Sequence, residues 1–310
     1  MKDAFEFKSL AEFLDYFCDE ETCRKYYAEI RFQNGGFCPH CNHKEIYAFK
    51  DGKRYRCAAC KQDFTIKTGT VFGESKLPLR KWFIAIYLLT TSGKGISSVQ
   101  LAKQVGVTQK TGWFIDHRIR EAMQQNGGQL FGTVEVDETY VGGLEKNKHK
   151  NKRTEGTQGR SPKVKTPIVG MIQRGGEIRA KVVERVTMAT VENQVKENVA
   201  KGSQLYTDDF LSYARLGKMF PHRAVSHASG EFVNGDAHSN TIESFWSLFK
   251  RGYHGIYHHM SRKHMQRYVD EFCFRFNRRK LDMQSVFSDT IVRMSQVGNL
   301  PYQALIQKPV

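Results

Sequence analysis

Four cysteines near the N-terminus restrict the possible folds of this chain more than any other feature. They form two pairs, Cys38-Pro-His-Cys41 and Cys57-Ala-Ala-Cys60, with fifteen residues between the pairs. Each pair can aim two thiolates at one tetrahedral zinc ion, and the residues between them suit a hairpin around Asp51-Gly52. The spacing therefore predicts a zinc ribbon over residues 36–68, in which Zn²⁺ is structural because four sulfur ligands leave no open position.

The charge balance indicates the kind of partner. Lys and Arg number 48 against 32 acidic residues, a formal net charge of +16 over 310 residues. Such an excess favours an anionic partner, with nucleic acid the first choice and a membrane surface the weaker alternative. The first residues do not resemble a signal peptide, and the apolar run at 82–89 is too short to cross a membrane. We therefore expect a cytoplasmic protein without a membrane partner.

The residues around the ribbon predict helices. Residues 1–35 are expected to form an N-terminal helical segment, and residues 69–125 a helical domain that begins with an apolar run at 78–91. Within that domain two helices are separated at 105–107, with Ser97 or Ser98 as the cap of the first and Thr108 as the cap of the second. This pattern is typical of a helix-turn-helix DNA-binding domain.

In a helix-turn-helix the start of the second helix reads DNA. Gln109, Lys110 and Thr111 lie there and would reach base edges, while Arg118 and Arg120 would meet phosphates. Two residues weaken the prediction, because Gly112 loosens the helix and Asp116 repels phosphate. An ordinary packed helix pair is the alternative.

A third region follows the linker at 124–129. Val134 and Val136 alternate with Glu135 and Asp137, as in a strand with one acidic side, and buried carboxylates are costly without a cation. A hairpin at 168–183, a helix at 190–201 and a strand ending on Asp208-Asp209 come next. Neighbouring strand residues face opposite ways, so only one of these two aspartates can address a shared site. The order predicts an α/β layout with a mixed sheet.

Three spaced acids carry a family resemblance. Asp137, Asp208 and Glu243, with Lys250 seven residues beyond, resemble the carboxylate set of DDE transposases, whose catalytic domain is RNase H-like. The stretches VDETYVGG, YTDDFLSY, HSNTIESFW, KRGYHGIYHHMS and YVDEFCFRFNRR resemble those of insertion-sequence transposases that have an N-terminal zinc ribbon and an ISXO-type catalytic domain.

The resemblance implies a fold and a site. It implies an RNase H-like mixed sheet flanked by helices at 130–285, followed by a C-terminal tail at 286–310. Asp137, Asp208 and Glu243 would hold two Mg²⁺ or Mn²⁺ ions. Lys250 would hold a phosphate near the metals, or else form a solvated ion pair.

Two positions in this set have rivals. Glu135 lies on the same strand face as Asp137, and only the family motif assigns the first position to Asp137. Asn240 either contributes to the site, as in branches with Asn at the third position, or caps the helix with Glu243 reaching back to it. Mg²⁺ favours charged oxygen, which makes Glu243 the better ligand.

A basic stretch at 145–165 completes the set of DNA contacts. Lysines without apolar periodicity suit a loop that becomes ordered on DNA, although a solvated loop is the alternative. The residues assigned to DNA are Lys148, Lys150, Lys152 and Arg153.

Together these features predict a DNA transposase of the bacterial nucleoid. It would bind the terminal inverted repeats of its element, cleave the ends and transfer the strands to target DNA as a homo-oligomer. A zinc-ribbon and helix-turn-helix transcription regulator is one alternative, but it leaves the acids without a purpose. An RNase H-like nuclease is another.

Overall fold

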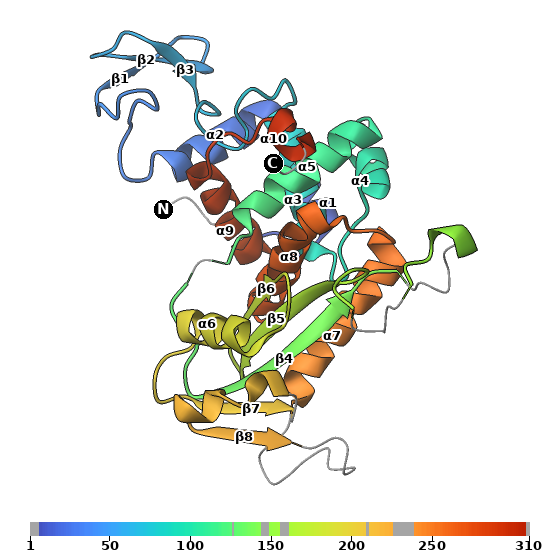
Figure 1. Cartoon of the computed structure of the whole chain (residues 1–310). Coiled ribbons are helices and arrows are strands. Elements are labelled where there is room, and N and C mark those ends of the chain that lie inside the picture. The colour runs from blue at the N-terminus through green and yellow to red at the C-terminus, as the bar shows by residue number, and fades with distance from the viewer. Residues whose placement is uncertain are drawn as a thin grey trace. The chain divides into compact units, whose positions relative to one another are not determined.

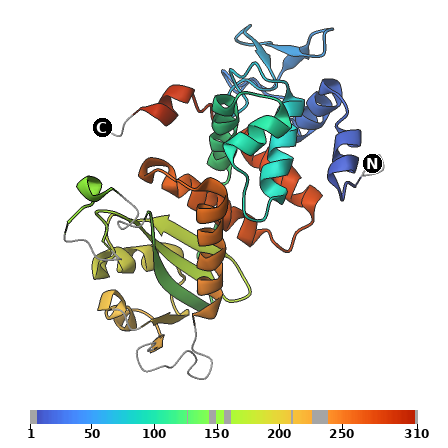
Figure 2. The same cartoon turned by 90° about the vertical axis from the view of Figure 1, so that its right-hand side faces the viewer.

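The chain divides into two units. The structure, a computed structural model, describes residues 6–125, 127–143, 149–155, 161–208, 211–225 and 239–307. One unit contains Met1–Met123 together with Lys280–Val310, and the other contains Gln124–Arg279 (Figure 1 and Figure 2).

The zinc ribbon is a small antiparallel sheet in the first unit. Strand β1 (Ile46–Ala48) pairs with β2 (Arg54–Cys57), which also pairs with β3 (Asp63–Thr65). The hairpin around Gly52 is as predicted, whereas β3 was not. Cys38, Cys57 and Phe64 form the buried centre of this sheet, so the side of the ribbon that holds the cysteines is also its hydrophobic core.

Helices make up the rest of the first unit. Their bounds are α1 (Leu10–Tyr16), α2 (Glu20–Arg31), α3 (Leu79–Thr91), α4 (Ser98–Val105), α5 (Gln109–Ala122), α9 (Met283–Gln296) and α10 (Tyr302–Ile306). Helix α3 is the most apolar and buries Trp82 and Phe83 completely, as expected for the run at 78–91.

The predicted break between α4 and α5 is confirmed. Ser97 caps α4 by accepting a hydrogen bond from the Gln100 amide, and Thr108 caps α5 by accepting from the Thr111 amide. Gly106 ends α4 with φ +68°, a left-handed conformation that costs glycine little. The two helices and their turn have the helix-turn-helix layout.

Gly112 has a role in this packing that the sequence did not indicate. A Cβ atom at this position would lie 2.8 Å from the Ser98 carbonyl oxygen and 2.9 Å from the Ala102 Cβ. Glycine therefore allows α5 to cross close to α4, rather than merely loosening α5. Asp116 is 1% exposed, so it does not present its charge to a phosphate.

The prediction that Arg118 contacts DNA is wrong. Its side chain is 2% exposed, and Arg120 is 1% exposed. The Arg118 guanidinium donates to the carbonyl oxygens of Val71, Gly73 and Leu300, and to Asn299 Oδ1, over 2.8–3.0 Å. Burial lowers the pKa of Arg118 to about 10. This arginine joins α5 to neighbouring segments, so it is not available to phosphate.

Residues 286–310 do not form the separate C-terminal tail that was expected. Helix α9 buries Phe287, Ile291 and Met294, and it packs against α2, α3 and α5. Further along, the Tyr302 ring lies 5.7 Å from that of Phe114. The apolar spacing of α9 is helical and could have been read from the sequence, so this segment belongs to the hydrophobic core of the first unit.

The second unit is built on a five-stranded mixed sheet. Its strands are β4 (Thr133–Val141), β5 (Thr166–Gln173), β6 (Ile178–Val182), β7 (Gln204–Asp208) and β8 (His222–Val225). Their order is β6-β5-β4-β7-β8, with β4, β5 and β6 antiparallel and β7 and β8 parallel to β4. This topology confirms the predicted RNase H-like α/β fold.

Helices cover both faces of this sheet (Figure 1). Helix α6 (Met188–Asn198) packs on one face, and α7 (Asn240–Gly252) and α8 (Met265–Asn277) pack on the other. Short one-turn helices lie in the connections between the main elements, at Lys150–Lys152, Leu211–Tyr213, Leu216–Lys218 and Arg262–His264. A π-helix follows α7 at Tyr253–Tyr257.

Among the described residues, none of the helices is both long and apolar enough to cross a bilayer.

Candidate active site

Three carboxylates meet where β4 and β7 part. The pairing of these two strands ends at Glu135 and Tyr206, and the acids lie just beyond. Asp137 comes from β4, and Asp208 is the last residue of β7. Together with Glu138 they offer ligand atoms that all lie within 4.8 Å of one another. The two aspartates predicted from the sequence are therefore brought together.

Glu138 was missed because it follows Asp137 directly on the strand, and adjacent strand residues normally face opposite ways. Its carboxylate is nevertheless in the cluster, at a point of β4 beyond the last residue that pairs with β7. Glu138 is 8% exposed and accepts a hydrogen bond of 2.5 Å from the Tyr213 hydroxyl. The pair of neighbouring acids in Val-Asp-Glu-Thr was the only available signal.

The electrostatics of this cluster favour a bound cation. Burial, followed by the negative charges of Glu138 and Asp208, raises the pKa of Asp137 to about 7. Repulsion of this kind is relieved when a divalent ion sits among the oxygens. Carboxylates are the hard donors that Mg²⁺ and Mn²⁺ prefer, so the donor set fits the expected metals.

Glu243 approaches from α7 but is not a member of the close cluster. It lies in the first turn, is exposed, and its Oε1 accepts a hydrogen bond of 2.9 Å from the Ser239 hydroxyl. Its charge also contributes to the raised pKa of Asp137. The third predicted acid is thus near enough to act electrostatically on the first.

Asn240 does not cap this helix. Ser239 occupies the N-cap position, and Asn240 is the first helical residue, with an exposed side chain. The interpretation of Asn240 and Glu243 as a capping box is therefore wrong.

Glu135 is excluded as the rival of Asp137. Its side chain is fully buried. Its Oε1 accepts hydrogen bonds from Arg174 and the Thr241 hydroxyl, and its Oε2 accepts from two backbone amides in the first turn of α7. These bonds keep Glu135 out of the cluster, to which β4 contributes Asp137 and Glu138.

The remaining predicted residues are mostly on the surface. Lys250 is exposed on α7, and no ion pair involves it among the residues that the structure describes, which disfavours a salt bridge to Glu243. Lys150 and Lys152 are the first and last residues of a one-turn helix, and Arg153 follows it; Lys150 and Arg153 are exposed. Lys148 lies outside the described residues.

Gln109 and Lys110 are exposed at the start of α5, and Thr111 is half-buried. Gln109 Nε2 donates to Ser98 Oγ over 3.1 Å, and Lys110 Nζ lies 4.7 Å from the centre of the Tyr302 ring. Both side chains rest on neighbouring residues yet remain open to solvent, which is compatible with DNA contact.

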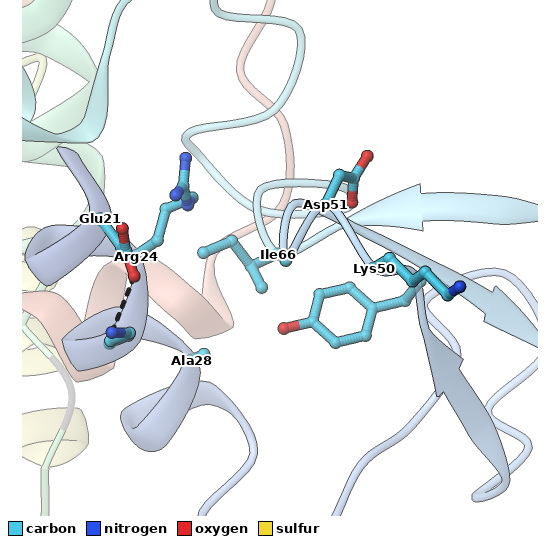
Figure 3. A pocket seen from close by; sticks show the side chains of 9 residues that line it. Glu21, Arg24, Ala28, Lys50, Asp51 and Ile66 are labelled. Atoms are coloured by element: carbon cyan, nitrogen blue, oxygen red, sulfur yellow. Dashed lines mark ion pairs between the residues drawn. The ribbon is translucent and has the colours of Figure 1, made fainter.

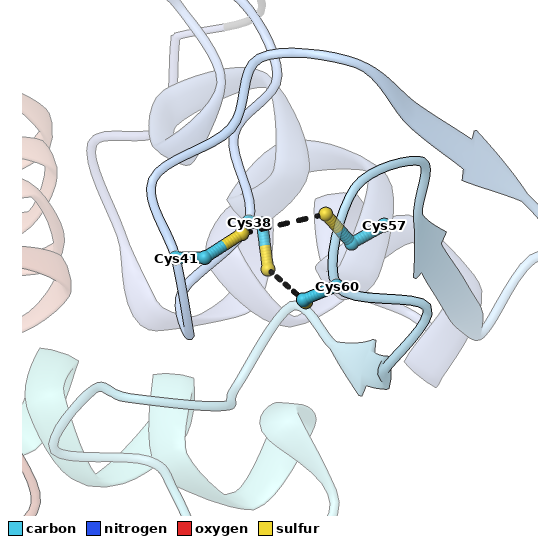
Figure 4. Close-up of side chains that lie close together, drawn as sticks. All are labelled: Cys38, Cys41, Cys57 and Cys60. Atoms are coloured by element: carbon cyan, nitrogen blue, oxygen red, sulfur yellow. Dashed lines mark hydrogen bonds between the residues drawn. The ribbon is translucent and has the colours of Figure 1, made fainter.

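The zinc centre has the geometry of a four-sulfur site. Cys38 Sγ lies 3.6 Å from Cys60 Sγ, and Cys41 Sγ lies 3.5 Å from Cys57 Sγ (Figure 4). Zinc–sulfur bonds of about 2.3 Å place the sulfurs of a tetrahedral site about 3.8 Å apart. The four thiols therefore fit a structural zinc ion, which would hold the two turns of the ribbon together.

The first unit also has a pocket between α2 and the zinc ribbon (Figure 3). Its volume is about 270 Å³, and Arg24, Lys25 and Lys50 line it together with Glu21 and Asp51. Lys25 forms an ion pair of 2.8 Å with Glu21. The mixed charge of this lining does not favour one class of ligand.

Close packing of α7 on the sheet should be essential to the site, and Gly170 allows it. Gly170 pairs with Asp137 across the β4–β5 ladder, and a Cβ atom there would lie 2.4 Å from Trp246 Cζ2. We expect Gly170→Ala to displace α7 and to cost about 1–3 kcal/mol of unfolding free energy, measured by denaturant titration. Gly128→Ala is the matched control because nothing lies within 4 Å of its Cβ position, and equal losses in the two variants would contradict this account.

Acidic residues on two adjacent central strands of an RNase H-like sheet, Asp137 within β4 and Asp208 at the end of β7, are the arrangement expected of a DDE-type transposase. Comparison with known proteins agrees. Residues 129–277 match the ISXO2-like transposase domain, and residues 18–63 match the transposase zinc-ribbon domain. The chain belongs to the IS1595 family of insertion-sequence transposases.

Individual relatives cover much of the chain. An uncharacterised protein in the transposable element ISH50 of Halobacterium salinarum is 32% identical over 247 residues, which is 76% of this chain and 83% of that protein. An uncharacterised transposase-like protein of Haemophilus influenzae is 31% identical over 120 residues, 37% of this chain and 94% of that one. Among solved structures, the Mos1 strand transfer complex is 14% identical, with a TM-score of 0.28 over 69% of this chain and 75% of that chain.

Proposed function

We propose that this protein binds the terminal inverted repeats of its insertion sequence, cleaves the DNA ends and transfers them to a target. The convergence of Asp137 and Asp208 in one half-buried acidic cluster is the observation that carries the proposal. A transcription regulator has no use for such a cluster, and the family match over 129–277 argues against an unrelated nuclease.

The proposed metal ligands are Asp137, Asp208 and Glu243. Two Mg²⁺ or Mn²⁺ ions held by these acids would lower the pKa of the attacking oxygen and stabilise the leaving oxygen. A water molecule first cuts the strand at the element end, and the freed 3′-hydroxyl then attacks the target DNA. No covalent bond to the protein is required.

Other residues have positioning roles in this proposal. Ser239 orients Glu243 through its hydroxyl, and Lys250 binds a phosphate of the DNA near the acids. Lys148, Lys150, Lys152 and Arg153 contact the DNA backbone, while Gln109, Lys110 and Thr111 read the repeats. Two DNA ends must be held at once, so the active form is a homo-oligomer on DNA.

The direct test is DNA cleavage by the purified wild-type protein. We expect Mn²⁺ or Mg²⁺ to support cuts at the ends of the inverted repeats that flank the gene, followed by joining to target DNA, as seen on sequencing gels. Binding to the repeats without cutting would instead favour a regulator, and cutting without regard to sequence or joining would favour a nuclease.

The helix-turn-helix gives a separate prediction on DNA binding. Lys110→Ala should weaken binding to the repeats and reduce the slope of log affinity against log salt by about one. Fluorescence anisotropy at several salt concentrations measures both quantities. Lys25→Ala is the control because Lys25 lies on α2 and pairs with Glu21. An unchanged slope in Lys110→Ala would mean that Lys110 does not contact a phosphate, and an equal reduction in both variants would mean that the effect is not specific to α5.

A further inference from the structure

Helix α7 carries Glu243, yet its own N-cap residue does not cap it. An N-cap side chain normally accepts a hydrogen bond from the second or third amide of the helix. Ser239 makes no such bond and instead donates its hydroxyl to Glu243. The first turn of α7 must therefore find its hydrogen-bond acceptor elsewhere.

Glu135 on β4 provides that acceptor. Its Oε2 accepts from the backbone amides of Thr241 and Ile242, each over 3.0 Å, and its Oε1 accepts from the Thr241 hydroxyl over 3.0 Å. The carboxylate is fully buried, and a negative charge at a helix N-terminus is favourable. A strand residue more than a hundred positions earlier in the sequence therefore replaces the local cap.

Arg174 links the same carboxylate to β7, the third element of the site. Its Nε donates to Glu135 Oε1 over 2.8 Å, and its guanidinium lies 4.6 Å from the centre of the Tyr206 ring. Tyr206 lies on β7, two residues before Asp208. Glu135 and Arg174 thus join the three elements that carry the three proposed metal ligands.

The geometry points to Glu135 as a positioning residue for the reaction, with Arg174 as its partner. Glu135 holds the first turn of α7 against β4 and so sets the distance from Glu243 to Asp137, which lies two residues along the strand. This inference rests on the proposed function, because it assigns a role relative to those ligands. Glu135 itself has no free oxygen for a metal, since each oxygen already accepts two hydrogen bonds.

The chemistry of Glu135 predicts an order among its variants. Glutamine keeps one oxygen for the α7 amides but loses the bond from Arg174, whereas alanine loses every bond. Residues that orient metal ligands cost roughly 10- to 100-fold in metal affinity or activity when they are replaced. We therefore expect Mn²⁺ affinity and kcat to fall by about that factor in Glu135→Ala and by less in Glu135→Gln, with KM for DNA unchanged.

The control is Asn277→Ala in the same unit. Asn277 pins α8 to β6 by accepting from the Ile178 amide over 2.8 Å and donating to the Ile178 carbonyl over 3.1 Å. Its loss should lower the melting temperature without changing kcat. If a general loss of stability caused the lower Mn²⁺ affinity and kcat of Glu135→Ala, then Asn277→Ala with the same melting temperature would show the same losses.

The experiment uses the full-length, zinc-loaded protein and measures three properties of each variant. Hydrogen exchange of the peptide over 239–249 measures how firmly Glu135 holds the first turn of α7. Mn²⁺ titration measures the metal affinity of the acidic cluster, and cleavage kinetics give kcat and KM. We expect this peptide to exchange faster in Glu135→Ala than in Glu135→Gln, and faster in both than in the wild type. In Asn277→Ala it should exchange at the wild-type rate. Unchanged exchange in Glu135→Ala overturns the inference, and so does faster exchange with unchanged Mn²⁺ affinity and kcat. Failure of the wild type itself to bind Mn²⁺ or to cut DNA would overturn the proposed function and this inference with it.

Discussion

Replacing Asp137 or Asp208 with alanine is expected to abolish DNA cleavage and strand transfer while leaving binding to the inverted repeats intact. Each aspartate belongs to the cluster whose ligand atoms lie within 4.8 Å of one another, so either change removes a charged metal ligand. Metal ions contribute several kcal/mol to phosphoryl transfer, and each 1.4 kcal/mol is tenfold in rate, so the expected loss is about a thousand-fold or more.

The repeat-binding assay and a matched variant make this result specific. Glu177→Gln removes one negative charge from an exposed side chain in the same unit, and it should cut DNA at the wild-type rate. Near-normal transfer by both Asp137→Ala and Asp208→Ala would refute the assignment of these acids.

The same assay decides the third ligand. Glu243→Ala should be as inactive as the two aspartate variants if its carboxylate closes onto the metals, whereas Asn240→Ala should keep most activity. Glu138 is the competitor that the structure adds, because it lies inside the cluster. If Glu138→Ala were inactive and Glu243→Ala active, the third metal ligand would be Glu138 on β4 rather than Glu243 on α7.

Removing one zinc ligand should unfold the ribbon. In Cys57→Ser we expect loss of the bound zinc, measured by atomic absorption, and loss of amide protection over residues 36–68. The physical reason is that structural zinc provides an apparent stabilisation of about 10–16 kcal/mol in small zinc domains. Cys57 is fully buried beside Phe64 in a core of very few residues, so little else supports this fold.

Cys18→Ser is the control for this prediction. Cys18 is an exposed thiol outside the four-sulfur group, so its replacement should leave zinc content and amide protection unchanged. A ribbon that stays protected in Cys57→Ser after zinc has been lost would show that the metal is dispensable for its fold.

Local signals explain what the sequence could predict. The paired cysteines lie within two short turns, so their spacing alone indicates the zinc ribbon. The break between α4 and α5 was also local, because Ser97, Gly106 and Thr108 each act on amides only a few residues away. Asp137 and Asp208 were found through the family motifs, since no local rule brings two distant strands together.

Tertiary contacts explain what the sequence could not predict. Arg118 looks like a DNA contact on a helical wheel, but its face of α5 is covered by segments around Val71 and Asn299. Glu135 and Asp137 share a strand face. Only the position of α7 shows that Glu135 is engaged in hydrogen bonds to that helix and that Asp137 is the one left for the acidic cluster. Strand β8 spans only His222–Val225, too short for its alternation of residue types to be recognised.

Crystals soaked in Mn²⁺ and measured at the manganese absorption edge test the central claim most directly. We predict anomalous peaks at the acidic cluster, two ions about 3.5–4 Å apart when DNA is bound, with oxygens of Asp137 and Asp208 as ligands. Manganese bound elsewhere, with these two carboxylates uncoordinated at saturating Mn²⁺, would contradict the account.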